Sequence, residues 1–277
     1  LLGVVKILYT LSKEWEGSIK CIFQPAEEQY PGGAQKMIKE GVLENPKVQK
    51  ILGQHVFPDL EVGKVGFCAG RYMASADEIR IIITGSGGHA ALPDTYNNPI
   101  IAAAKLITSL EDHFLPYRNI PSVLAIGLVK ANGYCNVIPD SAELKGTFRT
   151  IDEEFRVLAH SQMQEIAKKT ANEYALDINF ELCKGYPSLY NDEALTNSAI
   201  SYAKEYLGDK NVIDLSLRMT AEDFAYYCNE APSCFYRLGT ANKNKGITHG
   251  LHTSRFDIDE NSLKIGMGLM AYLAIKN

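Results

Sequence analysis

Apolar residues recur with two different periods along the chain, and both appear within the first sixty residues. Residues 1–12 carry apolar side chains at helical spacing, and residues 18–23 are typical of a buried strand. A short helix is predicted over residues 33–40, ending before Gly41, and a second apolar strand over residues 48–56. A strand, a helix and a strand of these lengths indicate a parallel α/β unit.

A strictly alternating pattern begins after Met73. Ile79, Ile81 and Ile83 alternate with polar residues, which predicts a strand with one face in water. The elements predicted after this strand are, in chain order, a helix over residues 98–112, strands over 122–129 and 142–150, a helix over 152–174 and a strand over 177–182. The order β-α-β-β-α-β is the split, ferredoxin-like arrangement.

The α/β pattern returns after residue 190. It predicts helices over residues 191–207, 222–227 and 260–275, a strand near Val212 and a strand over 234–238. We therefore predict an α/β protein with two domains. The larger domain consists of residues 1–73 plus 186–277, and a small ferredoxin-like domain, residues 74–185, is inserted into it.

The composition limits the class of protein. The chain has 277 residues, of which 46% are hydrophobic and 22% are charged, and this is typical of a soluble globular protein. A formal net charge of -5 argues against nucleic acid or an anionic membrane as the partner. No apolar run reaches the ~20 residues of a membrane span. The six cysteines form no Cys-x-x-Cys pair, so we expect reduced, mostly buried thiols and a cytoplasmic protein.

Two adjacent carboxylates follow the first predicted strand. Glu27 and Glu28 come directly after Pro25 and Ala26, where that strand meets its loop. Functional sites of open parallel sheets gather at the carboxyl ends of the strands. Neighbouring side chains of an extended segment point in opposite directions, so one carboxylate could bind a metal while the other faces a substrate. The simpler interpretation is a pair of solvated loop acids.

Two histidines complete a set of possible metal ligands. His55 lies at the predicted end of the strand over residues 48–56, and His252 precedes the last predicted helix. His55 alone is more often a half-buried histidine with a hydrogen-bond partner, and the His-x-x-His spacing of His249 and His252 alone is a weak zinc signal. Together with Glu28 they form an oxygen-plus-imidazole set that suits zinc, manganese, cobalt or nickel.

Three further residues of the inserted domain are candidates for substrate contacts. His89 ends the glycine-rich loop over residues 85–89, which lacks both the Lys-Ser/Thr of a phosphate-binding loop and the spacing of a dinucleotide fingerprint. We expect Asn136 and Arg149 to lie near neighbouring strand ends, where the guanidinium could bind a carboxylate. Structural roles for these residues remain open. Because no Gly-x-Ser-x-Gly elbow and no cysteine paired with a motif-like histidine are present, serine and cysteine acyl transfer are not favoured.

Seven blocks of the sequence match, in order, one known family. The chain resembles the aminoacylase and carboxypeptidase family of dinuclear metallohydrolases, and within it the hippurate hydrolase, N-acyl-amino-acid amidohydrolase and plant auxin-conjugate hydrolase branch. The blocks are Phe23-Gln24-Pro25-Ala26-Glu27-Glu28, Gly53-Gln54-His55-Val56, Gly87-Gly88-His89-Ala90-Ala91-Leu92-Pro93, Asn136-Val137-Ile138-Pro139, Gly146-Thr147-Phe148-Arg149, Ala221-Glu222-Asp223-Phe224 and Leu251-His252-Thr253. The resemblance implies a zinc-peptidase-like mixed sheet with helices on both faces and an inserted ferredoxin-like lid and dimerisation domain.

The resemblance also implies roles in the larger domain. Glu27 would be the general base that takes a proton from the attacking water and then protonates the leaving amine. Glu28, His55 and His252 would be ligands of two divalent metal ions, and the block that contains Glu222 would be structural or would support these ligands.

In the inserted domain, the resemblance implies contacts with the substrate. His89 would reach across a homodimer interface and stabilise the oxyanion in the partner subunit's site. Asn136 and Arg149 would hold the free carboxylate of the substrate. The domain would close by a hinge near Met73 and Gly185.

The implied activity is hydrolysis of the amide bond of N-acyl amino acids, which releases a carboxylic acid and an amino acid. Members of this branch carry an upstream His-x-Cys-Gly-His-Asp segment with the remaining ligands. This chain has no histidine before His55, so we expect it to be a truncated form. The alternatives are a dimerising module that binds carboxylates without catalysis and, within the family, a dipeptidase, a deacetylase or a carboxypeptidase.

Overall fold

The computed structural model describes residues 1–277, which divide into two compact units. The larger unit consists of Leu1–Tyr72, Leu189–Arg218 and Glu222–Asn277, and the inserted unit consists of Met73–Ser188 and Met219–Ala221. The segment predicted from the sequence as the inserted domain, residues 74–185, lies within this inserted unit.

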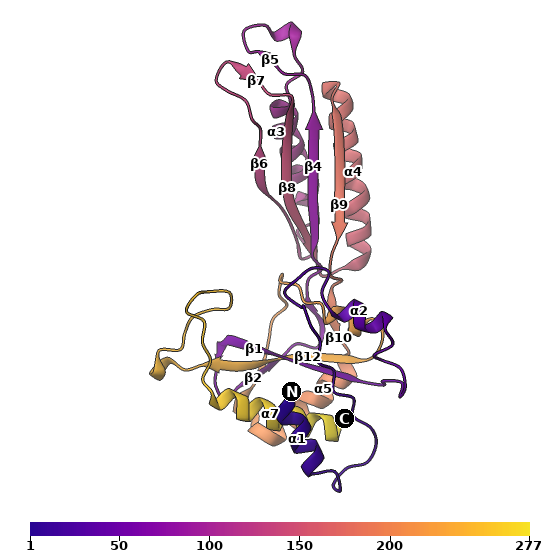
Figure 1. Cartoon of the computed structure of the whole chain (residues 1–277), viewed down its shortest axis with the longest axis vertical. Coiled ribbons are helices and arrows are strands. Elements are labelled where there is room, and N and C mark those ends of the chain that lie inside the picture. Colours follow the sequence, from indigo (N-terminus) through magenta and orange to yellow (C-terminus); the bar gives the residue numbers. More distant parts are fainter. The chain divides into compact units, whose positions relative to one another are not determined.

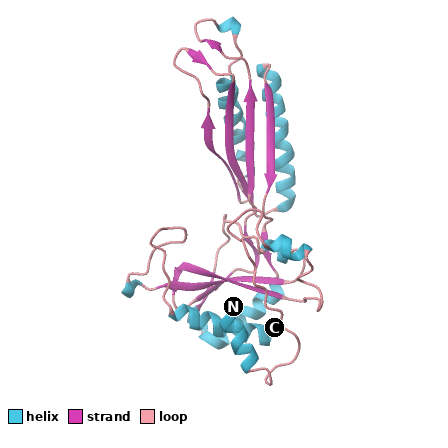
Figure 2. Cartoon of the chain, viewed as in Figure 1, coloured by secondary structure: helices cyan, strands magenta, loops and turns pink.

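A four-stranded mixed sheet forms the centre of the larger unit (Figure 2). Its order is β1-β12-β2-β11, with β1 over Ile51–Glu61, β12 over Ser233–Ala241, β2 over Val65–Phe67 and β11 over Val212–Asp214. Two pairs, β1 with β12 and β11 with β2, are parallel, whereas β12 and β2 are antiparallel. All nine residues of β12 are buried, as expected for a strand that has neighbours on both edges and a nearly continuous apolar sequence.

Helices lie on both sides of this sheet (Figure 1). On one side are α1 (Leu2–Thr10), α5 (Glu193–Leu207) and α7 (Asn261–Lys276), and on the other is the short α2 (Ala34–Lys39). The unit also contains α6 (Ala225–Cys228), the strand pair β10 (Leu189–Asn191) and β3 (Gly70–Met73), and the 3-10 turns η3 (Asp209–Asn211) and η4 (Lys243–Lys245). The core between the sheet and α5 and α7 includes the stacked rings of Phe67 and Tyr236, whose centroids are 5.0 Å apart. The predicted mixed α/β class is confirmed.

The inserted unit shows the predicted order of elements. Its sheet is antiparallel with the order β6-β8-β4-β9, and two long helices pack on one face (Figure 1). The bounds are β4 Asp77–Thr84, α3 Pro99–Phe114, β6 Ser122–Lys130, β8 Ser141–Thr150, α4 Glu153–Tyr174 and β9 Asp177–Lys184, with 3-10 turns η1 Pro93–Thr95 and η2 Leu115–Tyr117. Ile79, Ile81 and Ile83 are fully buried beneath the helices, as their alternation predicted. At one end of this sheet, β5 (Gly88–His89) pairs with β7 (Val137–Ile138).

A buried ion network joins α4 to the first strand of the inserted unit. The guanidinium of Arg156 donates hydrogen bonds to both carboxylate oxygens of Asp77, and His160 contacts the same carboxylate at 2.7 Å. Arg156 and Asp77 are both buried. Although burial by itself raises the pKa of Asp77, the hydrogen bonds from Arg156 and His160 hold it well below its ordinary value. The network therefore fixes the start of β4 against the start of α4.

Several expectations from the sequence are corrected. The predicted strand over residues 18–23 is wrong: the segment belongs to no sheet, and the side chain of Phe23 is exposed. A strand needs a partner for its backbone groups, and β1 stands at the edge of its sheet without pairing to this segment. Consequently the parallel strand-helix-strand unit is also wrong. All six cysteines are free, as predicted, but only Cys234 is buried.

No helix of the structure has the length and apolar character that crossing a membrane requires.

Candidate active site

The loop over residues 24–34 carries the two adjacent glutamates. Ala26, just before them, has a φ of 59°, in the left-handed region that non-glycine residues rarely adopt. Such strained positions cluster at functional sites, where the surrounding structure holds them. Glu27 is half-buried and Glu28 is exposed. The two carboxylates are therefore in different environments, as a base beside a ligand would require.

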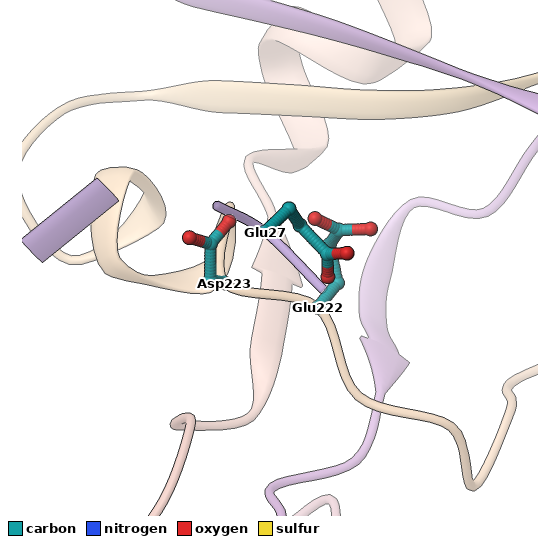
Figure 3. Close-up of side chains that lie close together, drawn as sticks. All are labelled: Glu27, Glu222 and Asp223. Atoms are coloured by element: carbon teal, nitrogen blue, oxygen red, sulfur yellow. The ribbon is translucent and has the colours of Figure 1, made fainter. Parts of the chain in front are cut away.

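Glu27 belongs to a cluster of three carboxylates. Oxygen atoms of Glu27, Glu222 and Asp223 all lie within 4.8 Å of one another (Figure 3). Burial, and then the charges of Glu28 and Asp223, raise the pKa of Glu27 above its ordinary value. Burial, followed by the charges of Glu27 and Asp223, raises the pKa of Glu222 to about 8. Glu222 therefore holds its proton at neutral pH and can donate it in the hydrogen bond that links its side chain to Glu27.

The carboxylate of Asp223, unlike that of Glu222, is surrounded by hydrogen-bond donors. Its two oxygens accept hydrogen bonds from the side-chain amide of Gln24, at 2.8 Å and 2.8 Å, and from the backbone N–H groups of Gly33 at 2.9 Å and Ala34 at 3.1 Å. A carboxylate that accepts four such hydrogen bonds, from three nitrogen donors, has little capacity left for a cation. Although the three acids are close enough to share an ion, we therefore assign Asp223 to the support of the loop.

His55 lies within β1 rather than at its end, because the strand continues to Glu61. The strand's register with β12 shifts between Phe57 and Glu61, where Pro58 has no N–H to donate. His55 Nδ1 lies 2.7 Å from the carbonyl oxygen of Val56, and since a carbonyl only accepts, Nδ1 carries the proton. The lone pair is then on Nε2, which leaves this nitrogen available as a metal ligand.

Glu28 and His252 share the surroundings of His55. Burial, and then the charge of Arg237, lower the pKa of His55, so its ring is neutral at neutral pH. Glu28 and His252 also act on this pKa, in opposite directions, because both lie within electrostatic range of the ring. His252 is exposed and has a φ of 59°, a second strained position at a predicted site residue. The ligand atoms of Glu28, His55 and His252 do not lie within 4.8 Å of one another, a spacing that only Glu27, Glu222 and Asp223 reach, so the structure brings the three into one region but not into a closed metal site. By residue type, one carboxylate and two imidazoles suit a divalent transition-metal ion.

The other predicted site residues belong to the inserted unit. His89 and Asn136 lie together at the end where β5 pairs with β7: the N–H of Ala90 donates to the Asn136 carbonyl at 3.0 Å, and both side chains are exposed. Arg149 lies near the opposite end of β8, where it donates to the carbonyl of Met219 at 3.3 Å.

The expectation that Asn136 and Arg149 lie near neighbouring strand ends is therefore wrong. Strand β8 runs from Ser141 to Thr150, and at ~3.4 Å per residue in an antiparallel strand its two ends are roughly 30 Å apart. Asn136 precedes the first end and Arg149 is next to the second. The pattern predicted the strands β6 and β8 correctly, but it did not show that Asn136 and Arg149 lie at opposite ends of β8.

Comparison with known proteins identifies the family. The model of the peptidase family M20/M25/M40 matches residues 1–276. The chain belongs to this family. The resemblance seen in the sequence blocks is thereby confirmed, and the protein is an enzyme of the hydrolase class.

Relatives of this M20 chain include a deacetylase and an amino acid hydrolase. It is 36% identical to N-acetylcysteine deacetylase of Bacillus subtilis over 279 residues, which cover 99% of the chain and 70% of that protein. It is 32% identical to IAA-amino acid hydrolase ILR1-like 4 of Arabidopsis thaliana, covering 100% of the chain and 63% of that protein. A solved Bacillus subtilis protein described as a dinuclear metal-binding peptidase of the M20 family has a TM-score of 0.81 and 33% identity, with 99% of this chain and 68% of that one covered.

Sequence reasoning missed one charged residue of this M20 site, Arg237. It is buried in β12, directly opposite His55 in the register of β1 and β12, and its Nε donates to the Tyr72 hydroxyl at 3.0 Å. Its positive charge lowers the pKa of both His55 and Glu222, after the larger effects already given. The available signal was an arginine within an otherwise apolar strand, because a buried guanidinium needs partners.

Proposed function

We propose that the protein hydrolyses the amide bond of N-acyl amino acids, with water as the second substrate and a carboxylic acid and a free amino acid as products. The observation that supports this most directly is the half-buried carboxylate of Glu27, which in this M20 chain is next to Glu28, a residue that lies with His252 within electrostatic range of His55. Two relatives, N-acetylcysteine deacetylase and an IAA-amino acid hydrolase, support the same substrate class by their names.

The proposed cofactors are two divalent metal ions, as in the solved relative described as dinuclear. Glu28, His55 and His252 would be among their ligands, and zinc, manganese, cobalt or nickel would suit this donor set. Bound at this position, such ions polarise a carbonyl group and make a water molecule a stronger nucleophile.

Glu27 is suited to carry the proton. Its carboxylate accepts the proton that the attacking water loses, and the resulting acid delivers the same proton to the amide nitrogen as the C–N bond breaks. Partial burial and neighbouring negative charge raise the pKa of Glu27, which brings it closer to neutral pH and makes it a better base and acid in turn. The protonated Glu222 fixes the direction of the Glu27 carboxylate through their hydrogen bond.

The carboxylate of the substrate is proposed to bind Arg149 and Asn136, with His89 stabilising the oxyanion. Because Arg149 lies at the opposite end of β8 from the other two, one chain cannot bring all three to one small substrate. We therefore propose a homodimer in which His89 and Asn136 act in the partner subunit's site. The edge strand β6, with Val123, Leu128 and Val129 exposed, offers a surface for this pairing.

The test uses the full-length protein and a panel of N-acetyl and N-benzoyl amino acids, with dipeptides and C-terminally extended peptides as the alternative substrates. We expect release of free amino acid from the N-acyl compounds, and loss of turnover in Glu27→Gln at unchanged metal content measured by elemental analysis. Full turnover by Glu27→Gln would refute the assignment of the base. Preferential cleavage of the peptides would indicate a dipeptidase or a carboxypeptidase instead.

A further inference from the structure

The loop over residues 24–34 is held at both of its ends by the same carboxylate. At its beginning, the side-chain amide of Gln24 donates to both oxygens of Asp223. At its end, the backbone N–H groups of Gly33 and Ala34 donate to Oδ2 of Asp223 at 2.9 Å and 3.1 Å. One side chain therefore closes the loop that carries both glutamates of the site.

The two glycines at the end of the loop show how closely the chain is folded around this carboxylate. A Cβ on Gly32 would be 2.3 Å from Oδ2 of Asp223, and the residue has a φ of 78°. A Cβ on Gly33 would be 1.9 Å from the carbonyl oxygen of Pro25, which belongs to the beginning of the loop. Since no side chain fits at either position, both residues must be glycine for the two ends of the loop to meet around this carboxylate.

Burial makes this arrangement stable. The side chain of Asp223 is 1% exposed, and a buried charge requires partners of this kind. Within the loop, backbone hydrogen bonds join Gln29 to Ala26 and Gly32 to Gln29. The middle of the loop is attached through the side chain of Glu27, which is hydrogen-bonded to the Glu222 side chain and to the backbone of Asp223, and the two ends are attached by the Asp223 carboxylate.

We infer that Asp223 is a positioning residue, which sets the place of Glu27 by holding both ends of its loop. The inference rests on the proposed function of Glu27 as the base. Asp223 is adjacent to Glu222, whose carboxyl group contacts Glu27 (Figure 3). A shift of Asp223 would therefore displace both the loop and the hydrogen-bond partner of the base.

The experiment compares three variants of the full-length protein. Asp223→Ala removes every acceptor of the loop. Asp223→Asn is the conservative variant, because its amide oxygen can still accept from the backbone N–H groups and the amide of Gln24 can rotate to accept from the new NH₂ group. Asp192→Ala is the matched control: in the same unit, it removes a carboxylate that accepts a backbone N–H, that of Leu195, at 2.8 Å without touching the loop.

Two readouts separate positioning from general stability. Displacement of a catalytic group by about 1 Å costs on the order of 100-fold in rate, so we expect a loss of that order in kcat for folded Asp223→Ala, with KM much less affected. Asp223→Asn should recover most of this loss, and Asp192→Ala should lower only the Tm. Hydrogen exchange followed by mass spectrometry should be faster over residues 24–34 in Asp223→Ala and unchanged there in Asp192→Ala.

A kcat near the wild-type value in folded Asp223→Ala would overturn the inference. If this variant does not fold, Gln24→Leu decides in the same way, because it removes one end of the attachment and should lower kcat on the order of tenfold through partial misplacement of the base. Failure of the proposed function has a different signature: the wild-type protein would not cleave N-acyl amino acids at all, while the exchange of residues 24–34 would still report whether Asp223 holds the loop.

Discussion

The protonated Glu222 predicts an unusual dependence of stability on pH. Its pKa is raised to about 8, mainly by burial and then by the charge of Glu27, and the side chain is 6% exposed. An acid whose pKa is higher in the folded than in the unfolded state favours folding at low pH, and this contribution is lost as the pH rises from the unfolded to the folded pKa. The window for Glu222 therefore extends from about pH 4.5 to about pH 8.

The magnitude follows from the two pKa values. One pKa unit corresponds to ~1.4 kcal/mol. The carboxyl group of Glu222 titrates near pH 8 in the folded state and near pH 4.5 in the unfolded state, and one state is half ionised at each end of this window. The free energy of unfolding therefore falls by about 4 kcal/mol between the two pH values. The variant Glu222→Gln has no proton to lose there and keeps a donor for Glu27. We expect its free energy of unfolding, relative to wild type, to rise with pH over this range.

Urea unfolding of metal-free protein at pH 5, 6, 7 and 8, followed by circular dichroism, measures this difference. Removal of the metal by a chelator is needed because bound cations add their own dependence on pH. Glu230→Gln is the matched control, since it makes the same chemical change at an exposed position of the same unit. Parallel stability curves for wild type and Glu222→Gln would refute the buried, protonated state of Glu222.

Three further predictions concern the ion network, the metal ligands and the dimer. Asp77→Asn removes the buried counter-charge of the Arg156 guanidinium and leaves only the partly exposed Glu153, so it should cost about 3–5 kcal/mol in urea unfolding at pH 7, and a loss below 1 kcal/mol would contradict this. Because hydrogen bonds hold the pKa of Asp77 down, the wild-type contribution should be present at neutral pH and decline as the pH falls below 4. Glu28→Gln should lower the metal content measured by elemental analysis, whereas an unchanged content would exclude this residue as a ligand. Coexpressed His89→Ala and Glu27→Gln subunits, each inactive alone, should together recover turnover because one site of the mixed dimer is intact, and no recovery would argue against action across the interface.

The sequence allowed much of the fold to be predicted because the burial pattern follows directly from alternation. Ile79, Ile81 and Ile83 indicated the face of β4 that α3 and α4 cover, and the order of elements of the inserted unit followed from the same pattern. The segment over residues 18–23 has equally apolar positions and was wrongly predicted as a strand. Apolar residues specify burial, but a strand also requires an adjacent backbone, which periodicity does not reveal.

The candidate site was predictable in its residue types but not in its arrangement. The motif blocks pointed to Glu27 and His55. Glu28 acts on the pKa of both residues, and His252 acts on the pKa of His55. The protonated state of Glu222 depends on burial and on a carboxylate about 200 residues away in sequence, so no local pattern could show it. The sequence pattern also did not show that Asn136 and Arg149 lie at opposite ends of β8, roughly 30 Å apart, because this depends on how the chain enters and leaves the strand.

The most direct test of the account is to locate the cations. Crystals of the full-length protein, prepared with zinc and measured on both sides of the zinc absorption edge, would show their positions by anomalous scattering. We expect peaks about 2.0–2.2 Å from Nε2 of His55, an imidazole nitrogen of His252 and a carboxylate oxygen of Glu28, with Glu27 beside the metal but not bound to it. Cations bound instead to Glu222 and Asp223, or none near His55, would contradict the proposed active site.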